Sequence, residues 1–412
     1  MKKIIVLIDP VSAGINLIDA ALETSDYIAV YTLGKERVMK YVDTLQEIEK
    51  TALQVIYSES TMEVLEKLDD KYLDRIVSVI PASEPGVVLA SSLAKKLGLI
   101  HLNEKSTIIC RDKTQVREEL KGLSLPTIGF GKCESYDDCL TFVDHHQLPV
   151  VVKHPTGAGQ NNIFICQDLK ELELAFDTII TSPNLFGQMT SVVLVEEYLD
   201  GEEYAVNFLV SNKIIRKLDT WRYEHYLFDE KNRLYDNITH YRKNHYGQDQ
   251  VEAYAESAIA AFGIDNGFIH LEVIDDKVRG PILVDIGARL IGGHFTTLIK
   301  KLGIGDPFQV ALKLYDGTLN IEDIKYDPKV AMTGVFLPIY KTGTIKEIKG
   351  IEEIKKRQGY SFHFCSLKPG QEIERSQELG NMAATFYFSA PKDSLLRGEI
   401  NFIRETFEIV YS

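Results

Sequence analysis

The sequence predicts a multi-domain protein of the α/β and α+β classes that begins with an open parallel α/β domain. A chain of 412 residues is too long for one ordinary core, so two or three domains are expected. Residues 1–108 alternate short apolar runs with helical patterns, which is typical of a parallel sheet covered by helices. From about Val330 the chain shows short strands separated by turns, and an amphipathic helix follows. The C-terminal part is therefore predicted to be rich in strands.

Within residues 1–108, apolar runs predict strands, and amphipathic patterns predict the helices between them. The predicted strands are Ile4–Ile8, Tyr27–Tyr31, Gln54–Tyr57 and Arg75–Ile80. The predicted helices are Ala13–Glu23, Lys35–Lys50, Thr61–Leu68 and Gly86–Leu97. Open parallel sheets bind ligands at the C-terminal ends of their strands. The loop after Ile80, which contains Glu84, is therefore a candidate substrate loop, and a plain connection is the alternative.

The next helix is predicted to begin after Asp112, because Asp112 and Gln115 have the spacing of a capping box, and to end near Gly122. Residues 127–200 have the pattern of a small α+β module. Its predicted elements are the strands Pro149–Lys153, Ile163–Cys166 and Ser191–Glu196 and the helix Leu169–Ile180. Later predicted elements are the strands Glu203–Val210, Lys213–Lys217, Val330–Leu337, Tyr360–Leu367 and Met382–Ser389 and the helices Val251–Phe262 and Leu395–Thr406.

Composition narrows the class of protein. The chain is 45% hydrophobic and 26% charged, as in soluble globular proteins, and its net charge of −14 argues against nucleic acid as a partner. Five scattered cysteines lack the pair spacing of a zinc site, so we expect no disulfide framework and a reducing cytoplasm. Asp9 and Pro10 interrupt the first apolar run, which therefore predicts a buried strand and not a signal peptide. No apolar run has transmembrane length.

A predicted hairpin, Gly267–Ile274 and Ile282–Arg289, places charges in an otherwise apolar sheet. Because alternate residues of a strand share a face, Glu272 and Asp285 can lie side by side, with Arg289 nearby. The same alternation puts Leu283 on the face of Asp285, and Ile282, Val284 and Ile286 on the opposite face. Two buried carboxylates need a cation, and a hard divalent metal such as Mg²⁺ meets that need. A sheet edge with solvated acids is the alternative.

A glycine-containing loop follows the predicted strand that ends at Lys153. Gly157 and Gly159 allow the backbone to approach a ligand and to turn its amides towards phosphate, and Lys153 can add a cation. The loop is neither a P-loop nor a dinucleotide fingerprint, because it lacks the Gly-Lys-Ser/Thr ending and the third glycine. An ordinary hairpin loop is the alternative.

The segment Val192–Val206 consists of two strand patterns that are interrupted at Asp200 and Gly201. Backbone groups and acidic side chains at the end of the first strand can pair with an adenine ring and with ribose hydroxyls. Acids suit such neutral donors and do not suit phosphate. A solvated hairpin turn is the alternative for this segment alone.

Taken together and in this order, these segments resemble the ATP-grasp superfamily of ligases over roughly residues 100–300. The matching pieces are Arg111–Lys113, Val151–Lys153 with its glycine loop, Glu196–Tyr204, His270–Glu272 and Val284–Arg289. The resemblance implies an N-terminal α/β domain (1–108), the small or lid part of the ATP-grasp fold (109–200) and its large part with a strand-rich C-terminal subdomain (201–412).

The resemblance also implies roles for individual residues. Phosphates of ATP would be bound by Lys113 and Lys153 together with the glycine loop. Adenosine would be bound by a group of residues at the strand end: Glu196 at the adenine amino group, the backbone around Glu197, Tyr198 and Leu199 at the ring, and Glu203 at the ribose. Glu272 and Asp285 would bind Mg²⁺, one or two ions, with Mn²⁺ as an open alternative. Arg289 would stabilise the reacting carboxyl-phosphate as a catalytic residue beside Lys153. The family often has an asparagine as third metal ligand, where this chain has Gly287.

Within the superfamily, the length of the chain, the string Asp285–His294 and the strand-rich tail are most similar to bacterial L-amino-acid ligases. These enzymes activate an amino-acid carboxylate as an acyl phosphate and join it to the amine of a second amino acid, giving a dipeptide, ADP and phosphate. Candidate substrate residues are Glu84, Glu224, His270, Arg289, Gly292 and His294. If acids such as Glu84, Glu224 and Asp219 line the pocket, a basic first amino acid is expected.

Two other functions stay open at this stage. One is another carboxylate–amine or carboxylate–thiol ligase of the superfamily that acts on a metabolite. The other is a non-catalytic nucleotide-binding regulatory protein, which the presence of all the catalytic charges disfavours. The expected partners are small-molecule amino acids, with no nucleic acid and no membrane, and the expected location is the cytoplasm. A homodimer is left open.

Overall fold

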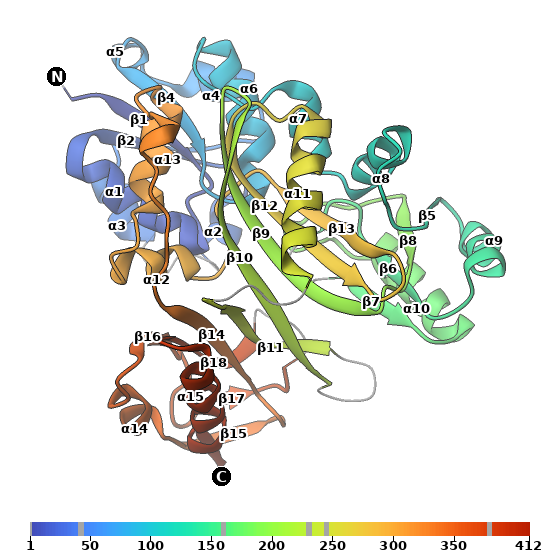
Figure 1. The fold of residues 1–412 in the computed structure, drawn as a ribbon. Coiled ribbons are helices and arrows are strands. Elements are labelled where there is room, and N and C mark those ends of the chain that lie inside the picture. Colours follow the sequence, from blue (N-terminus) through green and yellow to red (C-terminus); the bar gives the residue numbers. More distant parts are fainter. Residues whose placement is uncertain (1, 40–44, 158–161, 228–232, 243–246, 377–380) are drawn as a thin grey trace.

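The computed structural model describes the chain except for residues 1, 40–44, 158–161, 228–232, 243–246 and 377–380. The described strands form four sheets. The N-terminal sheet lies beside the centre of the molecule, a small sheet extends from the other side, and the largest sheet connects them (Figure 1). The predicted mixture of α/β and α+β architecture is confirmed.

The N-terminal sheet is parallel throughout, in the order β3-β2-β1-β4. Its strands are β1 (Ile4–Ile8), β2 (Asp26–Tyr31), β3 (Gln54–Tyr57) and β4 (Ile76–Pro81). The helical segments of this part are η1 (Ser12–Ile15), α1 (Asn16–Thr24), α2 (Lys35–Val38), α3 (Leu45–Thr51), α4 (Thr61–Lys67), α5 (Asp70–Leu73), η2 (Glu84–Gly86) and α6 (Val87–Lys96). The predicted strands agree with this sheet to within one residue at each end.

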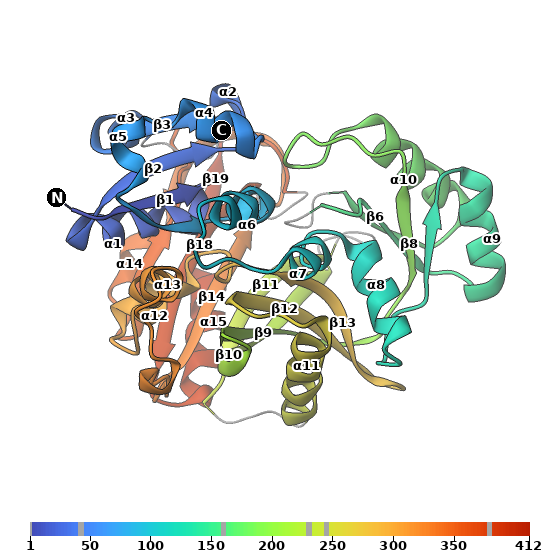
Figure 2. The same ribbon diagram turned by 90° about the horizontal axis from the view of Figure 1, so that it is seen from above.

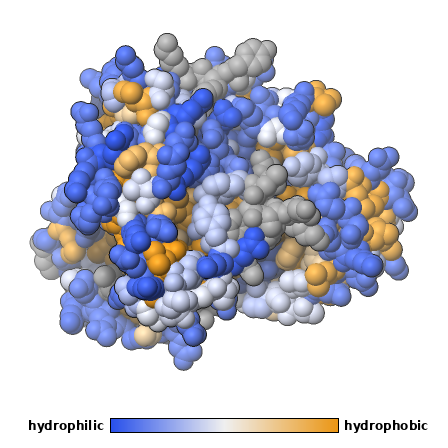
Figure 3. Space-filling model, turned by 90° about the horizontal axis from the view of Figure 1, so that it is seen from below, coloured by the Kyte–Doolittle hydropathy of each residue, from blue (hydrophilic) through white to orange (hydrophobic). Residues whose placement is uncertain are grey.

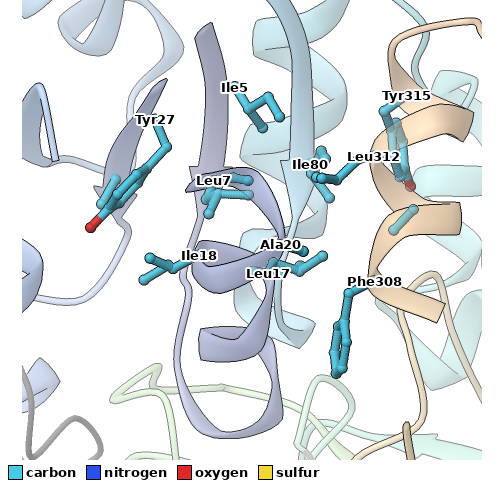
Figure 4. Packing of buried hydrophobic residues seen from close by; sticks show 14 of the residues in the cluster. Ile5, Leu7, Leu17, Ile18, Ala20, Tyr27, Ile80, Phe308, Leu312 and Tyr315 are labelled. Carbon is cyan, nitrogen blue, oxygen red and sulfur yellow. The ribbon is translucent and has the colours of Figure 1, made fainter. Parts of the chain in front are cut away.

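The N-terminal sheet is buried on both faces, which explains why its strands are continuous apolar runs. One face packs against α1 and against α13 (Pro307–Tyr315), a helix from much later in the chain (Figure 4). Phe308, Leu312 and Tyr315 of α13 join the cluster of Ile5 and Ile80. The N-terminal domain is therefore fixed to the following part by a shared apolar core.

The small sheet is antiparallel, in the order β5-β8-β6-β7, and we call it the lid sheet. Its strands are β5 (Phe130–Cys133), β6 (Val150–Lys153), β7 (Ile163–Cys166) and β8 (Val193–Glu197), and its helices are α9 (Tyr136–His146) and α10 (Leu169–Thr181). Both helices pack on the sheet through one apolar cluster. The lid sheet projects away from the N-terminal domain when viewed from above (Figure 2).

The largest sheet has eight antiparallel strands in the order β13-β12-β9-β10-β11-β14-β18-β16. They are β9 (Gly201–Ser211), β10 (Ile214–Leu227), β11 (Arg233–His240), β12 (Gly267–Asp276), β13 (Gly280–Gly287), β14 (Ala331–Pro338), β16 (Tyr360–Phe364) and β18 (Met382–Ala390). One face packs against α7 (Glu104–Ile109), α8 (Lys113–Gly122) and α11 (Gln248–Phe262). The opposite face packs against α12 (Phe295–Lys301) and carries the candidate site.

The remaining elements are η3 (Ile321–Asp323), a three-stranded sheet of β15 (Gly343–Lys349), β17 (Glu372–Ile373) and β19 (Glu408–Tyr411), and the helices α14 (Ile351–Lys355) and α15 (Asp393–Thr406). Seen from below, hydrophilic residues cover most of the surface and hydrophobic ones form separate patches (Figure 3). None of the helices in the described part of the chain is long and apolar enough to cross a bilayer.

Three sequence predictions need correction. The predicted helix Lys35–Lys50 is two helices, α2 and α3, on either side of residues that are not described. The predicted strand Lys213–Lys217 continues as β10 to Leu227, because polar residues such as Asp219 and Arg222 stay in the ladder with β9. The capping box is incomplete: Asp112 accepts a hydrogen bond from the backbone N–H of Thr114 at 2.8 Å, while the Gln115 side chain donates to Glu118.

Candidate active site

Glu272 and Asp285 face each other on adjacent strands, as the sequence predicts. Their Cα atoms are direct partners in the antiparallel ladder of β12 and β13. The two side chains keep about a quarter and a third of their surface exposed, at 23% and 31%. They therefore form a partly open pair of carboxylates on the edge strand β13 and its neighbour β12.

A β-bulge next to this pair overturns part of the predicted alternation. Val273 pairs with Leu283 while Glu272 pairs with Asp285, so Val284 is an extra residue on β13. Leu283 consequently joins Ile286 in the core below the sheet, while Ile282 and Val284 pack beside Leu199. The prediction that Leu283 shares the face of Asp285 is therefore wrong, and so is the prediction that Ile282 and Ile286 share a face. The extra residue of a bulge interrupts the strict alternation of side chains on which both predictions depend.

Arg117 holds this bulge and connects it to the lid sheet. The Arg117 side chain is fully buried, and its Nη2 donates to the carbonyl oxygen of Val284 at 2.6 Å. Its Nε donates to Glu196 Oε1 at 2.8 Å. Lys153 Nζ lies 2.6 Å from the other carboxylate oxygen of Glu196. One buried acid from the lid sheet is thus shared by two cations.

These ion pairs shift the pKa values of Glu196 and Lys153. Burial alone would raise the pKa of Glu196, but Arg117 and Lys153 outweigh it and the pKa is lowered. Burial lowers the pKa of Lys153, and the Glu196 carboxylate opposes that effect. Arg117 Nη1 has no hydrogen-bond partner among the described residues. A buried donor without a partner is costly, so this nitrogen is available to an incoming acceptor.

Lys113 joins the glycine loop to the pair of carboxylates. It begins helix α8, where its Nζ donates to the carbonyl oxygen of Gly157 at 2.8 Å and lies 3.0 Å from Asp285 Oδ2. Burial would raise the pKa of Asp285, and Lys113 together with Lys153 lowers it. Gly159, the second glycine predicted to bind phosphate, lies outside the described residues.

Arg289 is paired with an acid from the N-terminal domain. Its Nε donates to Glu84 Oε2 at 2.7 Å, and Arg111 Nη1 donates to Glu84 Oε1 at 2.7 Å. Glu84 lies over Gly287, where an added Cβ would come within 2.7 Å of Oε2. Burial opposes ionisation of Glu84, but the two arginines outweigh it and lower the pKa. The position of the expected third metal ligand is therefore covered by the Glu84 carboxylate.

The predicted adenosine segment forms the end of β8 and the turn into β9. Glu197 Oε1 accepts from the Gly129 backbone N–H at 2.6 Å and from Arg279 Nη1 at 2.5 Å. Leu199 is buried, whereas Tyr198 is only partly buried. Glu203 Oε2 lies 3.4 Å from His225 Nε2. The backbone of this turn is thus fixed at the junction between the lid sheet and the large sheet.

The remaining predicted substrate residues lie in three places. His270 lies next to the carboxylates, with Nε2 3.5 Å from Glu272 Oε1 and Nδ1 2.8 Å from Asn207 Oδ1. Glu224, on β10, accepts from Tyr241 and Asn237. Gly292 and His294 lie in the segment between β13 and α12, where the His294 ring stacks on Phe364 with centroids 4.0 Å apart. His294 therefore faces an aromatic cluster of the C-terminal strands.

Sequence reasoning missed Arg117, Arg111 and Asn207 as members of the site. Arg117 lies four residues after Lys113 on the same helix, and that spacing places both side chains on one face. This spacing was the available signal. Arg111 stood in the matching piece Arg111–Lys113 but received no role there, because its partner Glu84 lies 27 positions away. Asn207 carried no comparable signal, because its role depends on Asp219 of the next strand.

Residues 146–298 match the ATP-grasp domain. This segment contains the glycine loop, the turn after β8 and both strands of the carboxylate pair. This segment of the chain is therefore an ATP-grasp domain.

Comparison with known proteins gives a consistent set of relatives. Dapdiamide A synthase of Enterobacter agglomerans is 27% identical over 305 residues, which cover 73% of this chain and 70% of that protein. An L-arginine-specific L-amino acid ligase of Bacillus subtilis is 22% identical over 352 residues, covering 84% and 82%. The crystal structure of an L-amino acid ligase from Bacillus licheniformis covers both chains completely, with a TM-score of 0.79 at 19% identity. The chain is thus similar in sequence and in fold to ligases that form carbon–nitrogen bonds.

Proposed function

We propose that the protein uses ATP and Mg²⁺ to join two amino acids into a dipeptide. The carboxylate of the first amino acid attacks the γ-phosphate of ATP, and the products are an acyl phosphate and ADP. The amine of the second amino acid then displaces phosphate and forms the amide. The observation that carries this proposal is the convergence of Lys113, Lys153 and Arg289 around the Glu272–Asp285 pair.

Phosphoryl transfer needs charge neutralisation and alignment more than covalent participation by the protein. Lys113 and Lys153 supply positive charge beside the glycine loop, and Arg289 supplies it on the opposite side, next to the N-terminal domain. The lid sheet contributes Lys153 and Glu196, so movement of that sheet would open or enclose the reacting groups. Enclosure protects an acyl phosphate from water.

The Glu272–Asp285 pair fits a hard divalent metal by the chemistry of its donors. Both side chains are carboxylates, whose oxygens are ligands that Mg²⁺ prefers. In the structure, Lys113 Nζ supplies the compensating positive charge 3.0 Å from Asp285 Oδ2. Glu272 and Asp285 are the residues that would hold the ion. The chemistry it would supply when bound is positive charge that offsets the charge of the transferred phosphoryl group.

The names of the relatives support amino acids as substrates, since two of the similar proteins are L-amino acid ligases. The alternative of a non-catalytic regulatory protein is disfavoured because Lys113, Lys153, Glu272, Asp285 and Arg289 all converge in the structure. We further propose the domain boundaries near residues 108 and 200, which agree with the change from the N-terminal sheet to the lid sheet and then to the large sheet.

The test is incubation of the protein with ATP, Mg²⁺ and pairs of L-amino acids, followed by measurement of phosphate release and product mass. A dipeptide mass with stoichiometric phosphate supports the proposal, and no release with any pair contradicts it. Arg289→Ala provides a second test. We expect it to abolish ligation while ATP still binds, and loss of ATP binding would place Arg289 outside its assigned role.

A further inference from the structure

A cavity of about 250 Å³ adjoins Arg289 on the site face of the large sheet. It lies between strands β9, β10 and β12, the segment after β13, and helices α12 and α13. Its apolar wall includes Phe208, Leu218, Phe268, Ile291, Ile299 and Val310. A dry cavity of ~150 Å³ in another protein already accommodates benzene, so this one has room for a side chain of several carbon atoms.

Asp219 is a buried acid in the wall of this cavity, which Arg289, Asp306, Asp323 and Lys325 also line. Its side chain is buried, with 4% of its surface exposed. Oδ1 accepts hydrogen bonds from Asn207 Nδ2 and Trp221 Nε1, each at 2.5 Å. Across the described part of the chain, no cationic side chain lies within ion-pair distance of Asp219. Burying a carboxylate without a counter-charge is unfavourable, so a ligand that brings one would be stabilised here.

Three neighbouring acids differ from Asp219 because they already have cationic partners, and a fourth, Asp323, also lines the cavity but is exposed to solvent. Glu84 is shared by Arg111 and Arg289, and Asp306, which also lines the cavity, lies 2.8 Å from Lys300. Glu224 lies 4.0 Å from the Nε of Arg222. The expectation from sequence that three acids attract a basic substrate therefore reduces to Asp219.

Two hydroxyl groups of the cavity wall also lack hydrogen-bond partners in the part of the chain that the structure describes. Thr296 is 2% exposed, and its Oγ1 has no partner among the described residues. The Tyr326 hydroxyl lies close to Asp219 without a hydrogen bond of ordinary geometry. Burial, followed by the charge of Asp219, raises the pKa of Tyr326, so this hydroxyl stays protonated. Unsatisfied polar groups beside an apolar cavity indicate a ligand with both an alkyl chain and a polar end.

The cavity is connected to the reacting groups by a short chain of hydrogen bonds. Asn207 joins Asp219 to His270, which lies beside Glu272. Arg289 forms part of the cavity wall and also pairs with Glu84 above Gly287. An amino acid whose carboxylate lies near Arg289 can therefore extend its side chain towards Asp219.

We propose that this cavity binds the side chain of an amino-acid substrate that ends in an ammonium or guanidinium group, with Asp219 as its counter-charge and the Thr296 hydroxyl as an additional acceptor. The proposal rests on the proposed ligase function for its substrate class. The binding site itself rests on the cavity, the unpaired carboxylate and the unsatisfied hydroxyl.

Direct calorimetric binding of L-lysine and L-norleucine to the full-length protein, in the presence of Mg²⁺ and a non-hydrolysable ATP analogue, tests this proposal. The two amino acids have the same alkyl chain and differ in the terminal charge. We expect L-lysine to bind at least about tenfold more tightly than L-norleucine, because a hydrogen bond to a charged group lowers the free energy of binding by a corresponding amount. Equal binding of the two, or tighter binding of L-norleucine, would overturn the proposal.

Asp219→Asn isolates the charge, because the amide oxygen can still accept from Asn207 and Trp221. We expect this variant to lose the preference for L-lysine and to keep its affinity for L-norleucine. Thr296→Val should weaken L-lysine binding several-fold. Thr297→Val should not, because Thr297 Oγ1 also has no partner among the described residues but lies outside the cavity wall. An unchanged preference in both Asp219→Asn and Thr296→Val would contradict the proposal.

The binding measurement separates this inference from the ligase function. A retained preference for L-lysine without phosphate release from any amino-acid pair would leave the cavity assignment standing and remove the ligase. Phosphate release and ligation restricted to neutral amino acids, with no binding of L-lysine, would leave the ligase standing and remove the cavity assignment.

Discussion

Glu84 lies directly over Gly287, so that a Cβ at position 287 would come within 2.7 Å of the Glu84 carboxylate. The two residues come from different domains and are 203 positions apart in the sequence. Glu84 is held in this position by Arg111 and Arg289. The absence of a side chain at Gly287 is therefore what allows an acid of the N-terminal domain to reach Arg289.

We predict that Gly287→Ala folds but loses most of its activity, because the new methyl group displaces Glu84 from Arg289. Loss of a charge-assisted hydrogen bond at a reacting centre corresponds to a decrease in kcat/KM of about tenfold to a hundredfold. Steady-state phosphate release measures this effect. In a Glu84→Ala background the same substitution should have little further effect, and fully additive losses would refute the contact.

Arg117→Met should destabilise the protein strongly. The substitution leaves Glu196 with Lys153 alone and leaves the bulge carbonyl of Val284 without a donor. Breaking a buried charge network in this way costs about 3–5 kcal/mol. Arg75→Met is the matched control, since Arg75 pairs with Asp26 nearer the surface and its loss should cost at most about 1 kcal/mol. Similar values for the two variants in chemical denaturation would contradict the structural role of Arg117.

Asp9 is expected to make stability depend on pH. Burial raises the pKa of Asp9 from 3.8 to about 6, against hydrogen bonds from Thr32. The folded state therefore holds a proton that the unfolded state releases, and this contribution is lost as the pH rises from about 4 to about 6. Asp9→Asn should be more stable than the unchanged protein at pH 8, by up to about 3 kcal/mol, and equal to it near pH 4.

Thermal unfolding across this pH range measures the Asp9 effect. Asp19→Asn, at an exposed position of α1, is the control and should leave the pH profile unchanged. A stability difference between Asp9→Asn and the unchanged protein that does not vary with pH would show that Asp9 does not titrate as described.

His294 should remain neutral throughout the physiological range. Burial lowers its pKa to about 4, and its ring stacks on Phe364. We expect its NMR ring signals to be constant between about pH 5 and pH 8. A titration with a midpoint near 6.5 would show that the ring is solvated and free of the aromatic cluster.

The sequence predicted the regular parts of this molecule and the residues that act locally. The strands of the N-terminal sheet are continuous apolar runs, and the pairing of Glu272 with Asp285 follows from period-two alternation. The bulge at Val284 was not predictable, because its extra residue is stabilised by Arg117 from a distant helix. A side chain whose role depends on a distant partner leaves no local pattern.

The same reason explains what was missed in the site. Glu84 was predicted as a substrate residue from its place after a parallel strand, but its two arginines come from residues 111 and 289. In the sequence, nothing distinguishes Asp219 from the other acids, Glu84 and Glu224, that were considered for the pocket. Only the structure shows that Asp219 is buried beside a cavity and has no ion-pair partner among the described residues, while Glu84 and Asp306 are paired with cations.

The most direct test of the central claim follows oxygen atoms through the reaction. An amino acid labelled with oxygen-18 in its carboxylate is incubated with the protein, ATP, Mg²⁺ and an unlabelled second amino acid. If an acyl phosphate forms, the carboxylate oxygen that attacked the γ-phosphate leaves with it, and mass spectrometry detects one labelled oxygen in each released phosphate. Dipeptide formation with unlabelled phosphate, or phosphate release that does not depend on an amino acid, would contradict the account.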